Sequence, residues 1–108
     1  MIHEFKTYRA TAGNTKALID RFEKFTLPIL TRMGVKVLHC WTAEAEPDAF
    51  FYMVQFDSLQ ASKDAWAAFG ADPEWKAAKT ASEINGPLLA SQSTVYLQPT
   101  AFTPAKAQ

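Results

Sequence analysis

The chain has 108 residues, of which 48% are hydrophobic, 20% charged and 13% aromatic. This length and composition predict one globular domain with a single core, and they exclude a disordered chain. The 11 basic residues balance the 11 acidic ones and are scattered along the sequence, which excludes the basic patch of a nucleic-acid-binding protein.

The single Cys40 excludes an intrachain disulfide, and the longest apolar run, "AFFYMV", is too short to cross a membrane. No leader-like segment precedes the first expected strand. We therefore expect a cytoplasmic protein without membrane insertion.

The first expected strand is "HEFKTYRA" at 3–10, and neither of its faces is purely apolar or purely polar. A helix follows the turn "TAGN", with apolar residues at three- and four-residue steps: Leu18, Phe22, Phe25, Ile29 and Met33. Pro28 removes one backbone hydrogen bond from this helix, so a kink is expected at 24–27. Gly34 is a suitable residue to end it.

Strands at 35–44 and 49–56 form an expected hairpin with a rather long loop. The second of these strands is apolar on both faces, with Phe50, Tyr52, Val54 and Phe56 on one and Phe51, Met53 and Gln55 on the other. Such a strand is normally covered on both sides. The inward face of strand 35–44 stays open, because Val35, Val37, His39 and Trp41 compete with Leu38 and Cys40.

Two more helices and a strand complete the pattern. The first helix starts at Asp57 or Ser58, ends at Gly70 and turns three residues inward: Leu59, Trp66 and Phe69. Asp72 caps the second helix and Pro73 occupies its first position. The last strand, at 91–98, is ended by Pro99.

This order predicts an α+β, ferredoxin-like split βαβ fold, a four-stranded antiparallel sheet with helices on one face. We expect a single domain at 1–104 and a flexible tail at 105–108. The helices leave the other face of the sheet uncovered, and an uncovered apolar face is usually an interface. We therefore expect a homodimer through the sheet faces.

The sequence also resembles the NIPSNAP family. "MIHEFKTYRATAGN" is similar to the family's opening, "MIYELRTY…PG". "RFEKFTLPILTRMGVKVLHCWTAE", "VQFDSLQ", "DPEWKA" and "PLLASQSTVYLQPTAFTP" are similar to later family landmarks, in the same order. The resemblance runs from Met1 to Pro104. Three positions depart from the family pattern, where His3 replaces an aromatic residue, Lys6 an arginine and Tyr52 a histidine.

The resemblance implies a dimeric α/β barrel, in which two ferredoxin-like sheets meet face to face around a central cavity. It implies no defined activity. Related dimeric α/β barrels include cofactor-independent monooxygenases, lactone isomerases and haem-degrading enzymes, but sharing a fold does not transfer that chemistry.

The candidate ligand-binding residues come from the two middle strands of the expected sheet. They are Glu4, Lys6, Tyr8, Phe50, Tyr52, Val54 and Phe56. We place them on the face opposite the helices, in the cavity between two sheets, and assign Phe5 to the helix-covered core. The polar trio at 4, 6 and 8 either takes part in proton transfer or forms a salt bridge that fixes the register of the dimer.

Other chemistry is not supported by the sequence. Two histidines without metal-ligand spacing predict no metal site, and no phosphate-binding loop is present, so no cofactor is expected. Trp66 and Trp75 are interpreted as core residues, and Cys40 as an unreactive thiol.

Three functions fit these observations. The first is binding of a small, mostly apolar molecule between the two sheets, because aromatic walls with a few polar groups are typical of ligand pockets. The second is a cofactor-independent monooxygenase or isomerase that uses Glu4 or Tyr52 for proton transfer. The third is a protein-interaction module that works through its exterior.

Overall fold

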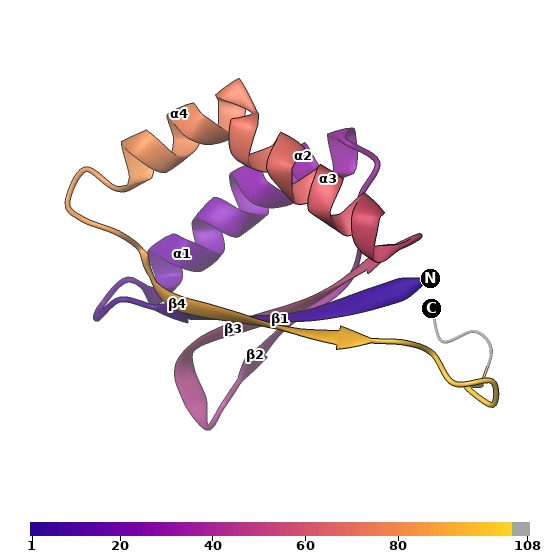
Figure 1. Cartoon of the computed structure of the whole chain (residues 1–108). Helices are drawn as coiled ribbons and strands as arrows, with labels where there is room; N and C mark the ends of the chain where they lie inside the picture. Colours follow the sequence, from indigo (N-terminus) through magenta and orange to yellow (C-terminus); the bar gives the residue numbers. More distant parts are fainter. Residues whose placement is uncertain (105–108) are drawn as a thin grey trace.

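The computed structural model describes residues 1–104, which form a sheet with a layer of helices on one of its faces (Figure 1). The strands are β1 (Ile2–Ala10), β2 (Lys36–Ala43), β3 (Glu46–Phe56) and β4 (Leu89–Leu97). The helices are α1 (Thr15–Arg21), the π-helix η1 (Phe22–Thr26), α2 (Leu27–Arg32), α3 (Leu59–Ala71) and α4 (Pro73–Ser82). The predicted tail, 105–108, lies outside the described residues.

The four strands are antiparallel, in the order β2-β3-β1-β4. This order confirms the predicted ferredoxin-like split βαβ fold. Strand β1 is central, and its Lys6 lies opposite Tyr52 of β3 and Thr94 of β4. Residues directly opposite each other in antiparallel strands share a face, so these side chains project to the same side of the sheet.

That side is the one covered by helices, and our face assignment was therefore wrong. Phe50, Tyr52, Val54 and Phe56 are buried with Phe22 of the first helix. Glu4, Lys6 and Tyr8 lie on this face as well, where Glu4 contacts helix α3. Phe5 instead lies on the open face, with its ring stacked 5.9 Å from that of Phe51.

The chain from α1 to α2 is one continuous helical segment interrupted by a π turn. In η1 the N–H of Leu27 donates to the carbonyl of Phe22, five residues back. Pro28 follows in the first turn of α2, so the predicted disturbance at 24–27 is present as a π turn. The extra residue rotates the apolar stripe: Thr26 is buried, whereas Phe25, predicted to face inward, is 38% exposed.

Local signals elsewhere set the ends of the helices. Gly34 has φ +81°, and the N–H of the next residue donates to the carbonyl of Leu30, which forms a Schellman cap. The Ser58 side chain accepts from the N–H of Ala61, and that of Asp72 from the N–H of Trp75, as N-caps do. Leu59 was wrongly predicted to face inward and is 44% exposed.

Strand β2 contains an irregularity between Val37 and His39. Val37 therefore packs against the helix-side core, whereas His39 and Trp41 lie opposite Met53 and Phe51 on the open face. The sequence left open which face of strand 35–44 points inward. The bulge explains why no single set of alternating residues does so, because the direction of the side chains changes at this point of the strand. The hairpin to β3 has a turn at residues 44–45 and not the long loop that we predicted.

Among residues 1–104, no helix is long and apolar enough to cross a membrane.

Candidate functional site

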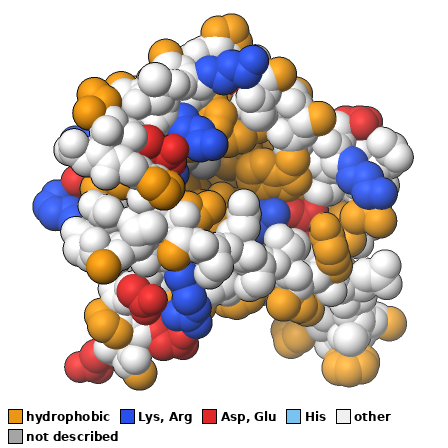
Figure 2. Space-filling model, turned by 60° about the vertical axis from the view of Figure 1, so that its left-hand side comes forward, with side chains coloured by type: hydrophobic (Ala, Val, Ile, Leu, Met, Phe, Trp, Pro, Cys, Tyr) orange, Lys and Arg blue, Asp and Glu red, His pale blue; other side chains and the backbone are white. Residues whose placement is uncertain are grey.

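A cavity of about 610 Å³ lies between the helix-covered face of the sheet and the helices. Figure 2 shows its opening, with hydrophobic side chains at the bottom and Lys or Arg side chains around it. The aromatic residues that line the cavity are Tyr8, Phe22, Trp66, Phe69, Trp75 and Tyr96. These walls come from the sheet, the π turn and both later helices, so the cavity forms only when the whole fold is assembled.

The polar base of the cavity is a buried network around Glu4, which is 0% exposed. Its carboxylate accepts hydrogen bonds from the hydroxyl of Ser62 and, at 3.0 Å, from the indole N–H of Trp66. The ammonium group of Lys6 lies 3.4 Å from the same carboxylate and donates to the hydroxyl of Thr94 at 2.9 Å. It also lies 4.6 Å from the ring centroid of Trp66. A buried carboxylate with this many partners is fixed in place, and so are the side chains that it contacts.

A tyrosine pair lies beside this network. The hydroxyl oxygens of Tyr8 and Tyr52 are 2.6 Å apart, and the two rings pack edge to face at 5.2 Å. Burial raises the pKa of Tyr8, and burial together with the neighbouring Tyr8 phenol raises the pKa of Tyr52 well above its ordinary value of 10.0. Both phenols are therefore protonated near pH 7 and can act as hydrogen-bond donors, with Tyr8 lining the cavity.

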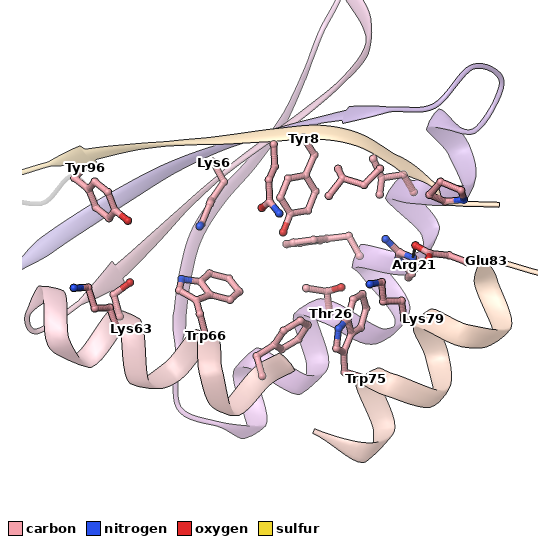
Figure 3. A pocket seen from close by; sticks show the side chains of 17 residues that line it. Lys6, Tyr8, Arg21, Thr26, Lys63, Trp66, Trp75, Lys79, Glu83 and Tyr96 are labelled. Carbon is pink, nitrogen blue, oxygen red and sulfur yellow. Dashed lines mark hydrogen bonds and ion pairs between the residues drawn. The ribbon is translucent and has the colours of Figure 1, made fainter. Parts of the chain in front are cut away.

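The opposite end of the cavity contains a buried guanidinium group (Figure 3). Arg21 is 7% exposed and donates through Nη1 to the hydroxyl of Ser82 at 3.0 Å and to the Glu83 carboxylate at 2.9 Å. Its guanidinium carbon lies 5.1 Å from the ring centroid of Trp75. Arg21 lowers the pKa of the Glu83 carboxyl, and nearby Lys79 adds to this effect. This end of the cavity is therefore positively charged and partly neutralised by one carboxylate.

The structure brings the predicted site residues together, but not all of them line the cavity. Lys6 and Tyr8 line it. Glu4 lies under Lys6, and Tyr52 lies behind Tyr8. The remaining three belong to the hydrophobic core: Phe50, Val54 and Phe56.

Sequence reasoning missed most of the helical contribution to the cavity. Arg21 lies three residues after Leu18 and next to Phe22, so a cation on the apolar side of the first helix was the available signal. Trp66 and Trp75, which we interpreted as core residues, line the cavity with one face. Tryptophan at a helical position suits both environments, so its residue type alone does not separate them.

The open face of the sheet carries a second, shallower apolar groove. Its lining residues are Phe5, Trp41, Thr42, Ala43 and Phe51. The rings of His39 and Trp41 stack 5.4 Å apart beside it. Within residues 1–104, no group of three or more His, Cys, Asp or Glu side chains has the arrangement of a metal site.

The sequence model of the NIPSNAP family matches residues 3–104. The chain belongs to the NIPSNAP family. A search of curated proteins finds no match. Among solved structures, an uncharacterized NIPSNAP domain protein from Burkholderia xenovorans is 27% identical to this chain. Its match covers 96% of this chain and 99% of that one, with a TM-score of 0.79.

Two further structures show how widely the fold of this NIPSNAP chain occurs. A NIPSNAP family protein from Agrobacterium tumefaciens is 19% identical, over 97% of this chain and 98% of that one, with a TM-score of 0.82. A protein from Chloroflexus aurantiacus, named as a putative antibiotic biosynthesis monooxygenase, is 19% identical. This match covers 98% of this chain and 100% of that one, with a TM-score of 0.61. At these identities the likeness shows the fold alone.

The three positions at which this NIPSNAP chain departs from the family pattern lie in different surroundings. His3 is on the open face, opposite Gln55 and Leu97. Lys6 lines the cavity, and Tyr52 forms the phenol pair behind it. Of these three residues, Lys6 alone lines the cavity.

Proposed function

We propose that this protein binds a small, mainly apolar molecule in the cavity between its sheet and its helices. The observation that carries this proposal is the cavity itself, about 610 Å³ in volume and walled by aromatic side chains from several elements. Pockets of this size, in which aromatic walls are combined with polar groups that orient a ligand, are typical of small-molecule sites. The buried network at Glu4 and Lys6 fixes one wall, so the site is preformed.

Calorimetric titration with 2-naphthamide, a flat neutral probe, tests this proposal. We expect saturable binding, which disappears in Gln92→Trp because Gln92 lines the cavity and an indole there fills its mouth. The matched control is Ala67→Trp, at an exposed position of α3 that is not part of the cavity wall. Equal binding in both variants would contradict the proposal, and so would the absence of binding of both this amide and the carboxylate of the same shape, 2-naphthoate.

The open face of the sheet pairs with a second copy of the chain. Support comes from the apolar groove between Phe5, Trp41 and Phe51, on a face that carries no helix (Figure 1). The formal net charge of zero adds no repulsion between copies, and the NIPSNAP resemblance implies a dimeric barrel. Native mass spectrometry of the purified protein tests the pairing, with a dimer expected and a monomer at micromolar concentration as the contrary result.

A second candidate function is cofactor-independent oxygenation or isomerisation inside the same cavity. It is favoured by the Tyr8 hydroxyl, which lines the cavity and is linked to Tyr52 at 2.6 Å. A phenol with a raised pKa is a donor that stabilises a developing oxyanion, and not a general base. The Chloroflexus aurantiacus protein of the same fold is named for monooxygenase activity.

Oxygen uptake with naphthalene-1,4-diol, measured above the uncatalysed rate, tests this second function. We expect turnover that falls about 100-fold in Tyr8→Phe, because that change removes the donor while retaining the ring. Equal rates with and without the protein would exclude this activity for this class of substrate.

A further inference from the structure

The guanidinium group of Arg21 has hydrogen-bonding capacity that residues 1–104 leave unused. It is 7% exposed and lines the cavity, and both of its hydrogen bonds are made by Nη1. Among residues 1–104, no fully buried side-chain nitrogen lacks a partner. Nε and Nη2 of Arg21 make no hydrogen bond to this part of the chain, and neither is fully buried, so both remain available to a ligand at the cavity wall. These two donors form the planar edge that binds both oxygens of a carboxylate.

The charges around the cavity do not cancel. Arg21 is paired with Glu83, and Lys6 with Glu4. Lys79 also lines the cavity, beside Arg21 in Figure 3, and forms no ion pair within 4.0 Å among the described residues. Lys79 is exposed and its charge is solvated, but it adds to the positive potential at this end of the cavity, which favours an anion over a neutral ligand.

An apolar surface adjoins these charged groups. The ring of Trp75 lies 5.1 Å from the guanidinium carbon of Arg21 and 4.7 Å from the ring of Phe69. A flat molecule on these rings can therefore extend a polar substituent to Arg21 without leaving the apolar wall.

We propose that the ligand is an apolar carboxylic acid, whose carboxylate binds Nε and Nη2 of Arg21 beside Lys79. Its flat or aliphatic body lies against Trp75 and Phe69. This inference rests on the proposed ligand-binding function and specifies the chemical class of the ligand. Glu83 opposes the ligand, because its carboxylate already accepts from Nη1 of the same guanidinium group and repels a second negative charge there.

The test compares two probes of the same shape, 2-naphthoate and 2-naphthamide, by calorimetry at pH 7. We expect the carboxylate to bind about tenfold more tightly than the amide, since hydrogen bonds to charged groups exceed neutral ones by roughly this factor. Arg21→Gln should remove this preference, and Lys79→Gln should reduce it. Glu83→Gln should strengthen carboxylate binding, because it removes a negative charge that repels the carboxylate of the ligand.

The matched control is Lys76→Gln, at an exposed position of the same helix that does not line the cavity, and it should leave both affinities unchanged. If the amide binds as tightly as the carboxylate, the carboxylate inference is wrong while the proposed function stands. If neither probe binds, both the inference and the proposed function fail.

Arg21→Gln could unfold the protein because it leaves Glu83 unpaired. In that case the test depends on the affinity for 2-naphthoate, which should increase in Glu83→Gln and decrease in Lys79→Gln. An affinity unchanged from that of the unaltered protein in both variants would overturn the inference.

Discussion

Individual polar residues of the cavity are buried with their partners already in place. Glu4 has a hydroxyl, an indole N–H and an ammonium group around its carboxylate, drawn from α3 and β1. A charge can be buried at tolerable cost only with such complete pairing. The network therefore fixes Lys6 and Trp66 in the cavity wall before any ligand arrives.

Glu4→Gln tests the energetic value of this network. The amide can still accept from Ser62 or Trp66, but Lys6 loses its counter-ion in a buried site. We expect a loss of about 3 kcal/mol in the free energy of unfolding, measured by urea denaturation at pH 7. Asp20→Asn, which removes an exposed pair with Lys16, should change it little. Similar losses in both variants would show that the buried charge has no special role.

Glu83, at the Arg21 end of the cavity, makes the stability of the fold depend on pH. Arg21 holds the pKa of the Glu83 carboxyl below its ordinary value of 4.5. Because the folded state keeps this carboxylate charged more readily than the unfolded chain does, the pair stabilises the fold above about pH 4.5. That contribution is lost as the pH falls through the lower pKa of the folded state. The free energy of unfolding should therefore fall more steeply with acid in the unaltered protein than in Glu83→Gln, and parallel pH profiles would contradict this.

At the scale of elements, the helix and strand positions could be predicted largely from local signals. Caps at Ser58 and Asp72, and the effect of Pro28, depend on residues close in sequence, and all are present in the structure. The face of each central strand could not be predicted in this way. β3 is apolar on both sides, and the polar residues of β1 are placed inward by Ser62 and Trp66, which are about 60 residues away in sequence.

The π turn gives the first helix a property that a regular α-helix would lack. η1 adds a residue between two buried positions, Phe22 and Thr26, and places Phe25 in solvent. Because a π turn holds more residues than an α turn, Thr26 and not Phe25 returns to the buried face one turn after Phe22. The sequence indicated a disturbance through Pro28 but not its form, since a kink and a π turn both accommodate a missing N–H.

Deletion of Phe25 tests this reading of the first helix. It removes the extra residue and should restore a regular α-helix with Leu18, Phe22, Thr26 and Ile29 still on the buried face. We expect a folded protein whose melting temperature, followed by circular dichroism, lies within about 8 °C of the original. Deletion of Asp20 is the matched control, because it rotates Leu18 about 100° away from the rest of the stripe and should unfold the domain. Equal effects of the two deletions would be incompatible with a π insertion.

The whole molecule has two distinct apolar surfaces on opposite sides of one sheet. The helix side encloses the cavity, whereas the open side carries half-exposed residues of every strand, among them Trp41, Phe51 and Val95. The sequence predicted that β3 is covered on both sides, but it did not reveal which surface encloses the cavity. The proposed pairing of two copies and the proposed binding of a ligand therefore use different residues, so each can be altered separately.

Val95→Lys tests the pairing of two copies at this scale. Val95 is 50% exposed and lies opposite Phe5 on the open face, so a lysine there is solvated in the monomer and buried without a partner in a dimer. Sedimentation velocity should show a dimer for the unaltered protein and a monomer for the variant, with unchanged 2-naphthamide binding. Ile84→Lys is the control, because Ile84 is 80% exposed and lies outside the sheet. A Val95→Lys protein that remains dimeric would exclude the open face as the interface. A variant that dissociates and also loses 2-naphthamide binding would show that the two surfaces depend on each other.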